Sequence, residues 1–124
     1  MRTSFHVTAA LSAAVAVVTV MAPVAAAEPD PSGCPKENFC VYAGEGQTGA
    51  VVLRVTDDWT GGVSGRSVFN NGIPFPEADH IQLTWTYNGG TWEDCLHYNP
   101  GPETYKLDFA PGVTFTKVVW RGEC

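Results

Sequence analysis

One segment, residues 81–98, constrains the fold of this chain most strongly, because apolar and polar residues alternate along it. The apolar positions are Ile81, Leu83, Trp85 and Tyr87, and the polar ones are Gln82, Thr84 and Thr86. This alternation is typical of a β-strand with one face in the core and the other in solvent. Asn88-Gly89-Gly90 follows, and Asn-Gly readily adopts the positive φ of a tight hairpin. The segment therefore predicts two antiparallel strands, 81–87 and 91–98.

The rest of the chain beyond residue 27 has the same character. Short runs rich in β-branched and aromatic residues are separated by glycine and proline, and no convincing helical period interrupts them. These runs predict strands at 39–42, 51–55, 67–70, 106–109 and 113–120. Because strands of this length and spacing suit a compact sandwich, we expect an all-β domain.

The first 27 residues are typical of a cleaved secretory signal peptide. Arg2 provides a positive start, and the apolar run 11–20 is too short to span a bilayer comfortably. Ala25-Ala26-Ala27 fits the small-residue pattern that signal peptidase recognises, and the composition changes at Glu28. A retained membrane helix is the alternative, but no later apolar run is long enough to act as a stop-transfer segment. We expect cleavage after Ala27 and a secreted, extracellular domain of residues 28–124.

All four cysteines, Cys34, Cys40, Cys95 and Cys124, lie in this expected domain. Export places them in an oxidising compartment, where thiols pair. Four cysteines allow three connectivities, and the most local one joins Cys34 to Cys40 and leaves Cys95 for Cys124. Their spacing lacks the paired ligands of a zinc site, so we expect two disulfides and neither a metal nor another cofactor. A bridge contributes about 3 kcal/mol, which matters in a domain of about 97 residues.

The balance of charges disfavours two classes of partner. The chain has 13 acidic and 7 basic residues, and loss of Arg2 with the signal peptide leaves 13 against 6, a net charge of about −7. Such a domain repels phosphate groups, and no basic stripe with interleaved aromatics is present. We therefore expect a monomer that binds neither nucleic acid nor an anionic membrane.

The sequence also disfavours an enzyme. It contains no Gly-x-Ser-x-Gly elbow, no His-Glu-x-x-His zinc helix and no Gly-x4-Gly-Lys phosphate loop. The nearest catalytic candidate is the dipeptide Asp79-His80, which opens an expected strand. A histidine at such a place is more often a structural hydrogen-bonding residue.

Several motifs, taken in order, resemble one protein family. They are Cys34-Pro35, the run 40–50 (CVYAGEGQTGA), Arg66-Ser67, Asn71-Gly72, His80-Ile81-Gln82-Leu83, Cys95-Leu96 and Ala110-Pro111-Gly112. In this order and spacing they are similar to the Streptomyces metalloproteinase inhibitor family. The resemblance spans nearly the whole expected domain, and it implies a βγ-crystallin-like Greek-key sandwich that inhibits an extracellular metalloproteinase.

The resemblance also implies a reactive segment. The bond presented to the protease would be Cys95–Leu96, and Leu96 would fill the apolar pocket after the scissile bond that thermolysin-like proteases favour. In the family a second, nearby cysteine clasps this segment, whereas this chain has Asn99-Pro100-Gly101-Pro102 there. The alternative is that Leu96 belongs to the core, because it shares one face of the expected strand with Trp92.

Two non-inhibitory binding functions are alternatives. A βγ-crystallin calcium site would use segments 57–62 (DDWTGG) or 70–74 (NNGIP), but both lack the later hydroxyl residues. A carbohydrate or peptide surface would use exposed aromatics such as Trp59 or Trp92. We expect the other two tryptophans, Trp85 and Trp120, to lie in the core.

Overall fold

The computed structural model describes residues 12–19 and 26–124. Most of the expected signal peptide, residues 1–11 and 20–25, lies outside the described residues, so its cleavage stays a prediction. Residues 12–19 form no regular secondary structure. Within the two described ranges, no helix is long and apolar enough to cross a membrane.

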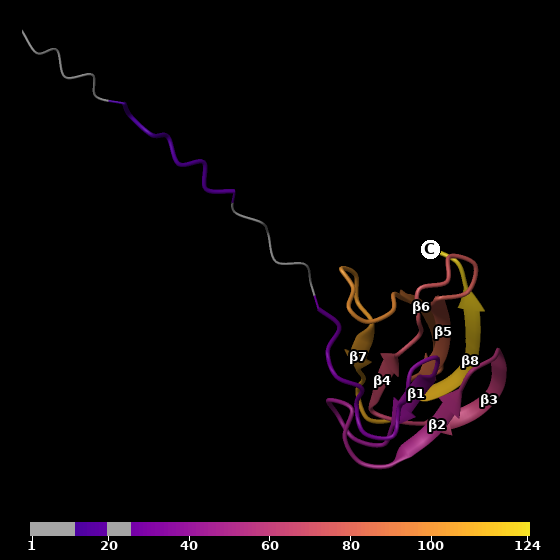
Figure 1. The fold of residues 1–124 in the computed structure, drawn as a ribbon. Coiled ribbons are helices and arrows are strands. Elements are labelled where there is room, and N and C mark those ends of the chain that lie inside the picture. Colours follow the sequence, from indigo (N-terminus) through magenta and orange to yellow (C-terminus); the bar gives the residue numbers. More distant parts are fainter. Residues whose placement is uncertain (1–11, 20–25) are drawn as a thin grey trace, which may run out of the picture.

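The described chain is all-β and forms two antiparallel four-stranded sheets, with no helix in residues 26–124 (Figure 1). The strands are β1 (Phe39–Tyr42), β2 (Val51–Val55), β3 (Trp59–Ser64), β4 (Ser67–Asn70), β5 (His80–Tyr87), β6 (Gly90–Leu96), β7 (Lys106–Asp108) and β8 (Thr114–Arg121). Their order is β2-β1-β4-β7 in the first sheet and β3-β8-β5-β6 in the second. The all-β prediction is therefore confirmed.

The first four strands, β1 to β4, and the last four, β5 to β8, form two halves with the same arrangement. Three strands of the first half, β1, β2 and β4, lie in the first sheet, and three strands of the second half, β5, β6 and β8, lie in the second. The third strand of each half crosses over, since β3 pairs with β8 and β7 pairs with β4. Each sheet thus needs a strand from the other half, and neither half completes a sheet alone.

The strands predicted from the sequence are present. Those at 39–42, 51–55 and 67–70 have the predicted bounds, and the hairpin pairs Trp85 with Trp92 around a turn with positive φ at Asn88 and Gly89. Strand β6 ends at Leu96 rather than at residue 98, and β3 was not expected. Its Gly61-Gly62 pair resembles a turn, but it forms an irregularity in the register between β3 and β8.

The main core lies between the two sheets. It consists of Phe39, Val41, Val68, Ile81, Leu83, Leu96, Val113, Phe115 and Val118. A smaller cluster on the other face of β1 contains Tyr42, Phe69 and the first disulfide. The Tyr42 hydroxyl donates a 2.8 Å hydrogen bond to the Ser32 carbonyl, so the N-terminal segment covers this face. β1 is consequently buried on both faces.

Two disulfides join Cys34 to Cys40 and Cys95 to Cys124, the connectivity favoured by local pairing. The first lies in the smaller cluster beneath the N-terminal segment. The second joins β6 to the end of the chain across 29 residues. It therefore fixes the C-terminal residues beside the edge strand of the second sheet.

Candidate functional site

The most exposed large apolar side chain in residues 26–124 is Phe75, with 52% of its surface accessible. It lies in the connection between β4 and β5, in the stretch Ile73-Pro74-Phe75-Pro76-Glu77, which we call the Phe75 loop. Ile73 is also exposed, at 43%. Because proline fixes φ near about −65°, the two prolines restrict the backbone on both sides of Phe75. The loop thus presents two apolar side chains on a stiff backbone.

A buried carboxylate anchors this loop. Asp79 Oδ2 accepts a 2.8 Å hydrogen bond from the backbone N–H of Phe75, and the Phe75 carbonyl accepts a 2.9 Å bond from the N–H of Ala78. Asp79 Oδ1 lies 2.6 Å from Nδ1 of His80, and both side chains are buried. The two oxygens of one carboxylate therefore connect the loop to the start of β5.

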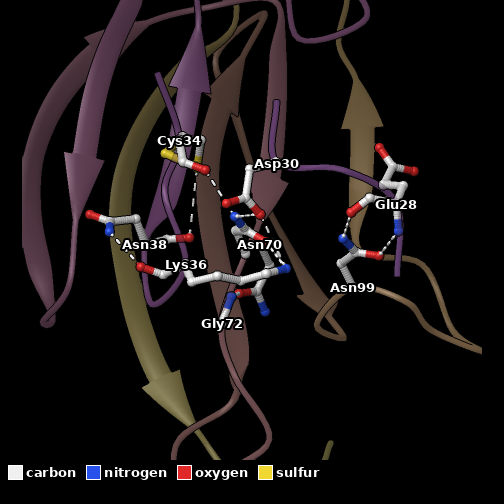
Figure 2. Close-up of polar contacts among 10 residues, drawn as sticks. Glu28, Asp30, Cys34, Lys36, Asn38, Asn70, Gly72 and Asn99 are labelled. Atoms are coloured by element: carbon white, nitrogen blue, oxygen red, sulfur yellow. Dashed lines mark hydrogen bonds and ion pairs between the residues drawn. A yellow bond between two sulfur atoms is a disulfide. The ribbon is translucent and has the colours of Figure 1, made fainter. Parts of the chain in front are cut away.

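Asn70 supports the base of the loop. Its Oδ1 accepts a 2.9 Å hydrogen bond from the N–H of Gly72, and its Nδ2 donates to the carbonyl oxygens of Asp79, at 3.0 Å, and Leu96, at 3.3 Å (Figure 2 shows the Asn70–Gly72 contact). The side chain is fully buried, so its amide is saturated by backbone groups. One asparagine thereby connects Gly72 and Asp79, which flank the loop, to Leu96 at the end of β6.

The C-terminal residues pack against the loop from another side. The connection between β4 and β5 runs beside the C-terminal end of the chain (Figure 1), and a Cβ on Gly122 would lie only 2.8 Å from the Pro76 carbonyl oxygen. Cys124, two residues later, is bonded to Cys95. The second disulfide therefore holds a backbone segment that supports the Phe75 loop.

A groove of about 820 Å³ lies beside the loop, and we call it the acidic groove. Its apolar lining includes Ile73, Phe75 and Trp120, and its acidic lining consists of Glu37, Asp57 and Asp58. The three carboxylates come from two connections, one before β1 and one between β2 and β3. Apolar and acidic side chains thus line the same groove.

The two aspartates of this groove have different local roles. Asp58 Oδ1 accepts a 2.8 Å hydrogen bond from the backbone N–H of Trp120, which fixes the β2–β3 connection to β8. Asp57 makes no hydrogen bond or ion pair with any other described residue and is exposed. Asp57 can therefore be replaced without removing a hydrogen bond or ion pair to another described residue.

The structure places the segment implied by the family resemblance in a different environment. Leu96 is fully buried in the core, and it pairs with Ile81 in the sheet. Cys95 is half-buried on the opposite face, bonded to Cys124. The alternative that Leu96 is a core residue is therefore the one that fits. A protease pocket could reach this side chain only if the end of β6 separated from β5.

In the 70–74 segment, considered for calcium, both asparagine side chains bind other parts of the protein. Asn71 Nδ2 donates to Asp30 Oδ1, at 2.9 Å, and to the Cys34 carbonyl, at 2.8 Å, while its Oδ1 accepts from Lys36. Together with the saturated amide of Asn70, this leaves the 70–74 segment without a free asparagine side chain. Across the described residues, no three His, Cys, Asp or Glu side chains gather as metal ligands.

Three of the four tryptophans lie as expected, and Trp59 does not. Trp92 is 46% exposed on β6 and lies beside Tyr87, whose ring centroid is 6.4 Å away. Trp59, Trp85 and Trp120 are half-buried and pack against the main core. Trp92 is therefore the exposed member of the pair considered for surface binding, whereas Trp59 covers the core.

The first residue of the expected mature domain is tied to the second half of the chain. Glu28 N–H donates to Asn99 Oδ1 at 3.0 Å, and Asn99 Nδ2 donates to the Glu28 carbonyl at 2.9 Å (Figure 2). The Glu28 carboxylate accepts a hydrogen bond from the Tyr105 hydroxyl and another, of 2.8 Å, from Lys106 Nζ. Partial burial raises the pKa of Glu28, but the bonds from Lys106 and Tyr105 outweigh it and leave that pKa lowered.

The Phe75 loop was missed from the sequence, although a signal was present. Two apolar residues alternate with two prolines shortly after a strand, which indicates a stiff, exposed connection. The supporting contacts from Asp79 and Gly122 depend on tertiary structure and have no such signal. A comparison of the chain with protein-family models, curated proteins and solved structures found no match in any of the three.

Proposed function

We propose that this protein is a secreted proteinase inhibitor that binds its target through the Phe75 loop, with metalloproteinases as the target class. The observation that carries this proposal is an exposed aromatic side chain whose backbone N–H is held by a buried carboxylate. An apolar residue on a fixed, protruding backbone is the element that a protease cleft binds as substrate. The metalloproteinase class comes from the family resemblance.

The physical basis of inhibition is preorganisation. Ordering a flexible segment costs about 0.5–1.5 kcal/mol for each immobilised side chain, and a loop already fixed by hydrogen bonds avoids much of this cost. The same contacts resist the movement that separates cleaved ends. Both peptide bonds of Phe75 involve proline, and the Phe75–Pro76 nitrogen carries no hydrogen. Tight binding with slow cleavage is the expected result.

This location differs from the Cys95–Leu96 bond implied by the resemblance. Leu96 is fully buried, whereas Ile73 and Phe75 are exposed. The second disulfide still contributes to inhibition, but indirectly, because it fixes the C-terminal segment whose Gly122 packs on Pro76. The clasp of the reactive loop is then supplied by tertiary contacts instead of an adjacent cysteine pair.

Two further features support the proposal. The exchange of the third strand between the two halves fits the βγ-crystallin-like Greek-key arrangement that the resemblance implies. Two disulfides agree with folding in an oxidising compartment, as secretion after cleavage at Ala27 requires. The βγ-crystallin-like fold and secretion are thus parts of the same proposal.

The experiment is a titration of the secreted protein, purified with both disulfides formed, against a thermolysin-like metalloproteinase. A serine protease of chymotrypsin-like preference, which also accepts Phe, serves as the class control. Stoichiometric inhibition of the metalloproteinase alone supports the proposal in full. Inhibition of the serine protease alone would retain the loop and reject the target class, and inhibition of neither would reject the function.

A second candidate function rests on Trp92. Its exposed ring lies beside Tyr87, and both residues line a hollow of about 450 Å³, where an aromatic face is available to stack on a sugar ring. The variant Trp92→Ala separates this candidate from the first. Loss of binding to a soluble polysaccharide with intact protease inhibition would assign the two surfaces to two functions.

A further inference from the structure

We infer that the acidic groove is a subsite for a basic side chain of the protein bound at the Phe75 loop. The Phe75 loop forms one wall of the groove, so a chain that covers Phe75 continues into it. The identity of the partner as a proteinase rests on the proposed function, whereas the preference of the groove for a basic side chain does not.

The lining has the two parts that a lysine or arginine side chain needs. Such side chains bury their methylene stems on apolar surface and keep the charged head near polar groups. Ile73, Phe75 and Trp120 supply the apolar surface, and Glu37, Asp57 and Asp58 supply the carboxylates. A neutral apolar residue would bring no opposite charge to these carboxylates, and an acidic residue would be repelled.

The size of the groove and the charge of the protein agree with this occupant. A volume of about 820 Å³ exceeds what one side chain fills, so the groove also has room for the neighbouring backbone. The chain carries 13 acidic and 7 basic residues, so the long-range field attracts basic partners as well. Asp57, which makes no hydrogen bond or ion pair with the other described residues, is the carboxylate most available to a ligand.

The wall formed by the loop is fixed before binding. Phe75 N–H donates to Asp79, and elsewhere in the lining Trp120 N–H donates to Asp58. Each of these two parts of the lining is therefore held by a hydrogen bond without a ligand. A basic side chain enters an existing depression rather than one that it has to open.

The test uses two short peptides as probes, acetyl-Leu-Arg-Leu-amide and acetyl-Leu-Gln-Leu-amide. Each is titrated into the full, disulfide-bonded protein, and binding is followed by the NMR signal of the Trp120 indole N–H. The variants are Asp57→Asn, which removes one groove carboxylate, and Glu103→Gln, which removes an exposed carboxylate outside the groove lining.

We expect the arginine peptide to bind about tenfold more tightly than the glutamine peptide at low salt. Asp57→Asn should weaken the arginine peptide about twofold to fivefold, as for loss of an exposed charge pair, and leave the glutamine peptide unchanged. Glu103→Gln should change neither. Equal affinity of the two peptides, absence of any shift at Trp120, or equal effects of the two variants would overturn the inference.

The outcome separates this inference from the proposed function. Selective binding of the arginine peptide by a protein that inhibits no protease would keep the subsite and reject the inhibitor. Inhibition of a protease by a protein that does not discriminate the peptides would keep the inhibitor and reject the subsite.

Discussion

The carboxylate of Asp79 accepts a 2.8 Å hydrogen bond from the backbone N–H of Phe75, so a buried acid fixes the backbone of the residue with the most exposed aromatic side chain in residues 26–124. The replacement Asp79→Ala leaves this N–H and Nδ1 of His80 without their acceptor. We expect the free energy of unfolding to fall by about 1–3 kcal/mol, together with weaker protease inhibition.

Asp79→Asn is the matched control for that prediction, because its amide retains one oxygen acceptor. Denaturant unfolding and inhibition titrations should place this variant between the wild type and Asp79→Ala. If Asp79→Ala inhibits as strongly as the wild type, the hydrogen bond does not preorganise the loop.

Gly122 provides a second test of loop support. A methyl group there would lie 2.8 Å from the Pro76 carbonyl oxygen, a backbone atom that cannot move without the loop. Gly122→Ala should therefore shift the Phe75 loop and cost about 1–3 kcal/mol of stability, as overpacking does. Gly62→Ala is the control, since its methyl group would meet only Thr114 at 3.8 Å. Equal inhibition by the two variants would show that the C-terminal segment does not position the loop.

The second disulfide should matter for both stability and binding. Replacing Cys95 and Cys124 together by serine frees the segment that contains Gly122 and removes a closure across 29 residues. Thermal and denaturant unfolding should show a loss of about 3–4 kcal/mol. Inhibition measured on the folded fraction should weaken as well; a loss of stability with unchanged inhibition would limit the disulfide to a structural role.

Glu28 gives the domain a pH dependence at its expected N-terminus. Its pKa is lowered in the folded state, so its contribution to stability is present above the unfolded value, about 4.5, and is lost as pH falls through the folded value. The hydrogen bond to Glu28 also raises the pKa of Tyr105 to about 12. The contribution of Tyr105 to stability is therefore lost as pH rises from about 10 to about 12. Glu28→Gln should reduce the fall in melting temperature at both the acidic and the alkaline end of the pH range, and Glu103→Gln should reduce neither.

Local patterns predicted most of the strands. The alternation along β5, the Asn88-Gly89 turn and the runs at 39–42, 51–55 and 67–70 lie where the sequence indicates. β3 was missed because Gly61-Gly62 has the composition of a turn. Its pairing with β8 compensates for the weak local preference, and such compensation comes only from the partner strand.

The candidate site was less predictable, for a physical reason. Whether Leu96 faces the core or solvent depends on which face of β6 meets the other sheet, and two-residue periodicity leaves that choice open. The Phe75 loop depends on contacts from Asp79, Asn70 and Gly122, which lie as far as 47 residues along the chain from Phe75. The sequence near Phe75 indicates its stiffness but not those supports.

The most direct test of the proposed inhibitor compares Phe75→Ala with Trp92→Ala, since both remove an exposed aromatic side chain and only one lies in the Phe75 loop. The measurement is the inhibition constant against a thermolysin-like metalloproteinase, with near-ultraviolet circular dichroism to confirm the fold. We expect strong inhibition by the wild type and by Trp92→Ala, and a loss of at least about 30-fold for Phe75→Ala, as for a binding hot spot. Equal inhibition by all three proteins, or none by the wild type, would contradict the proposal.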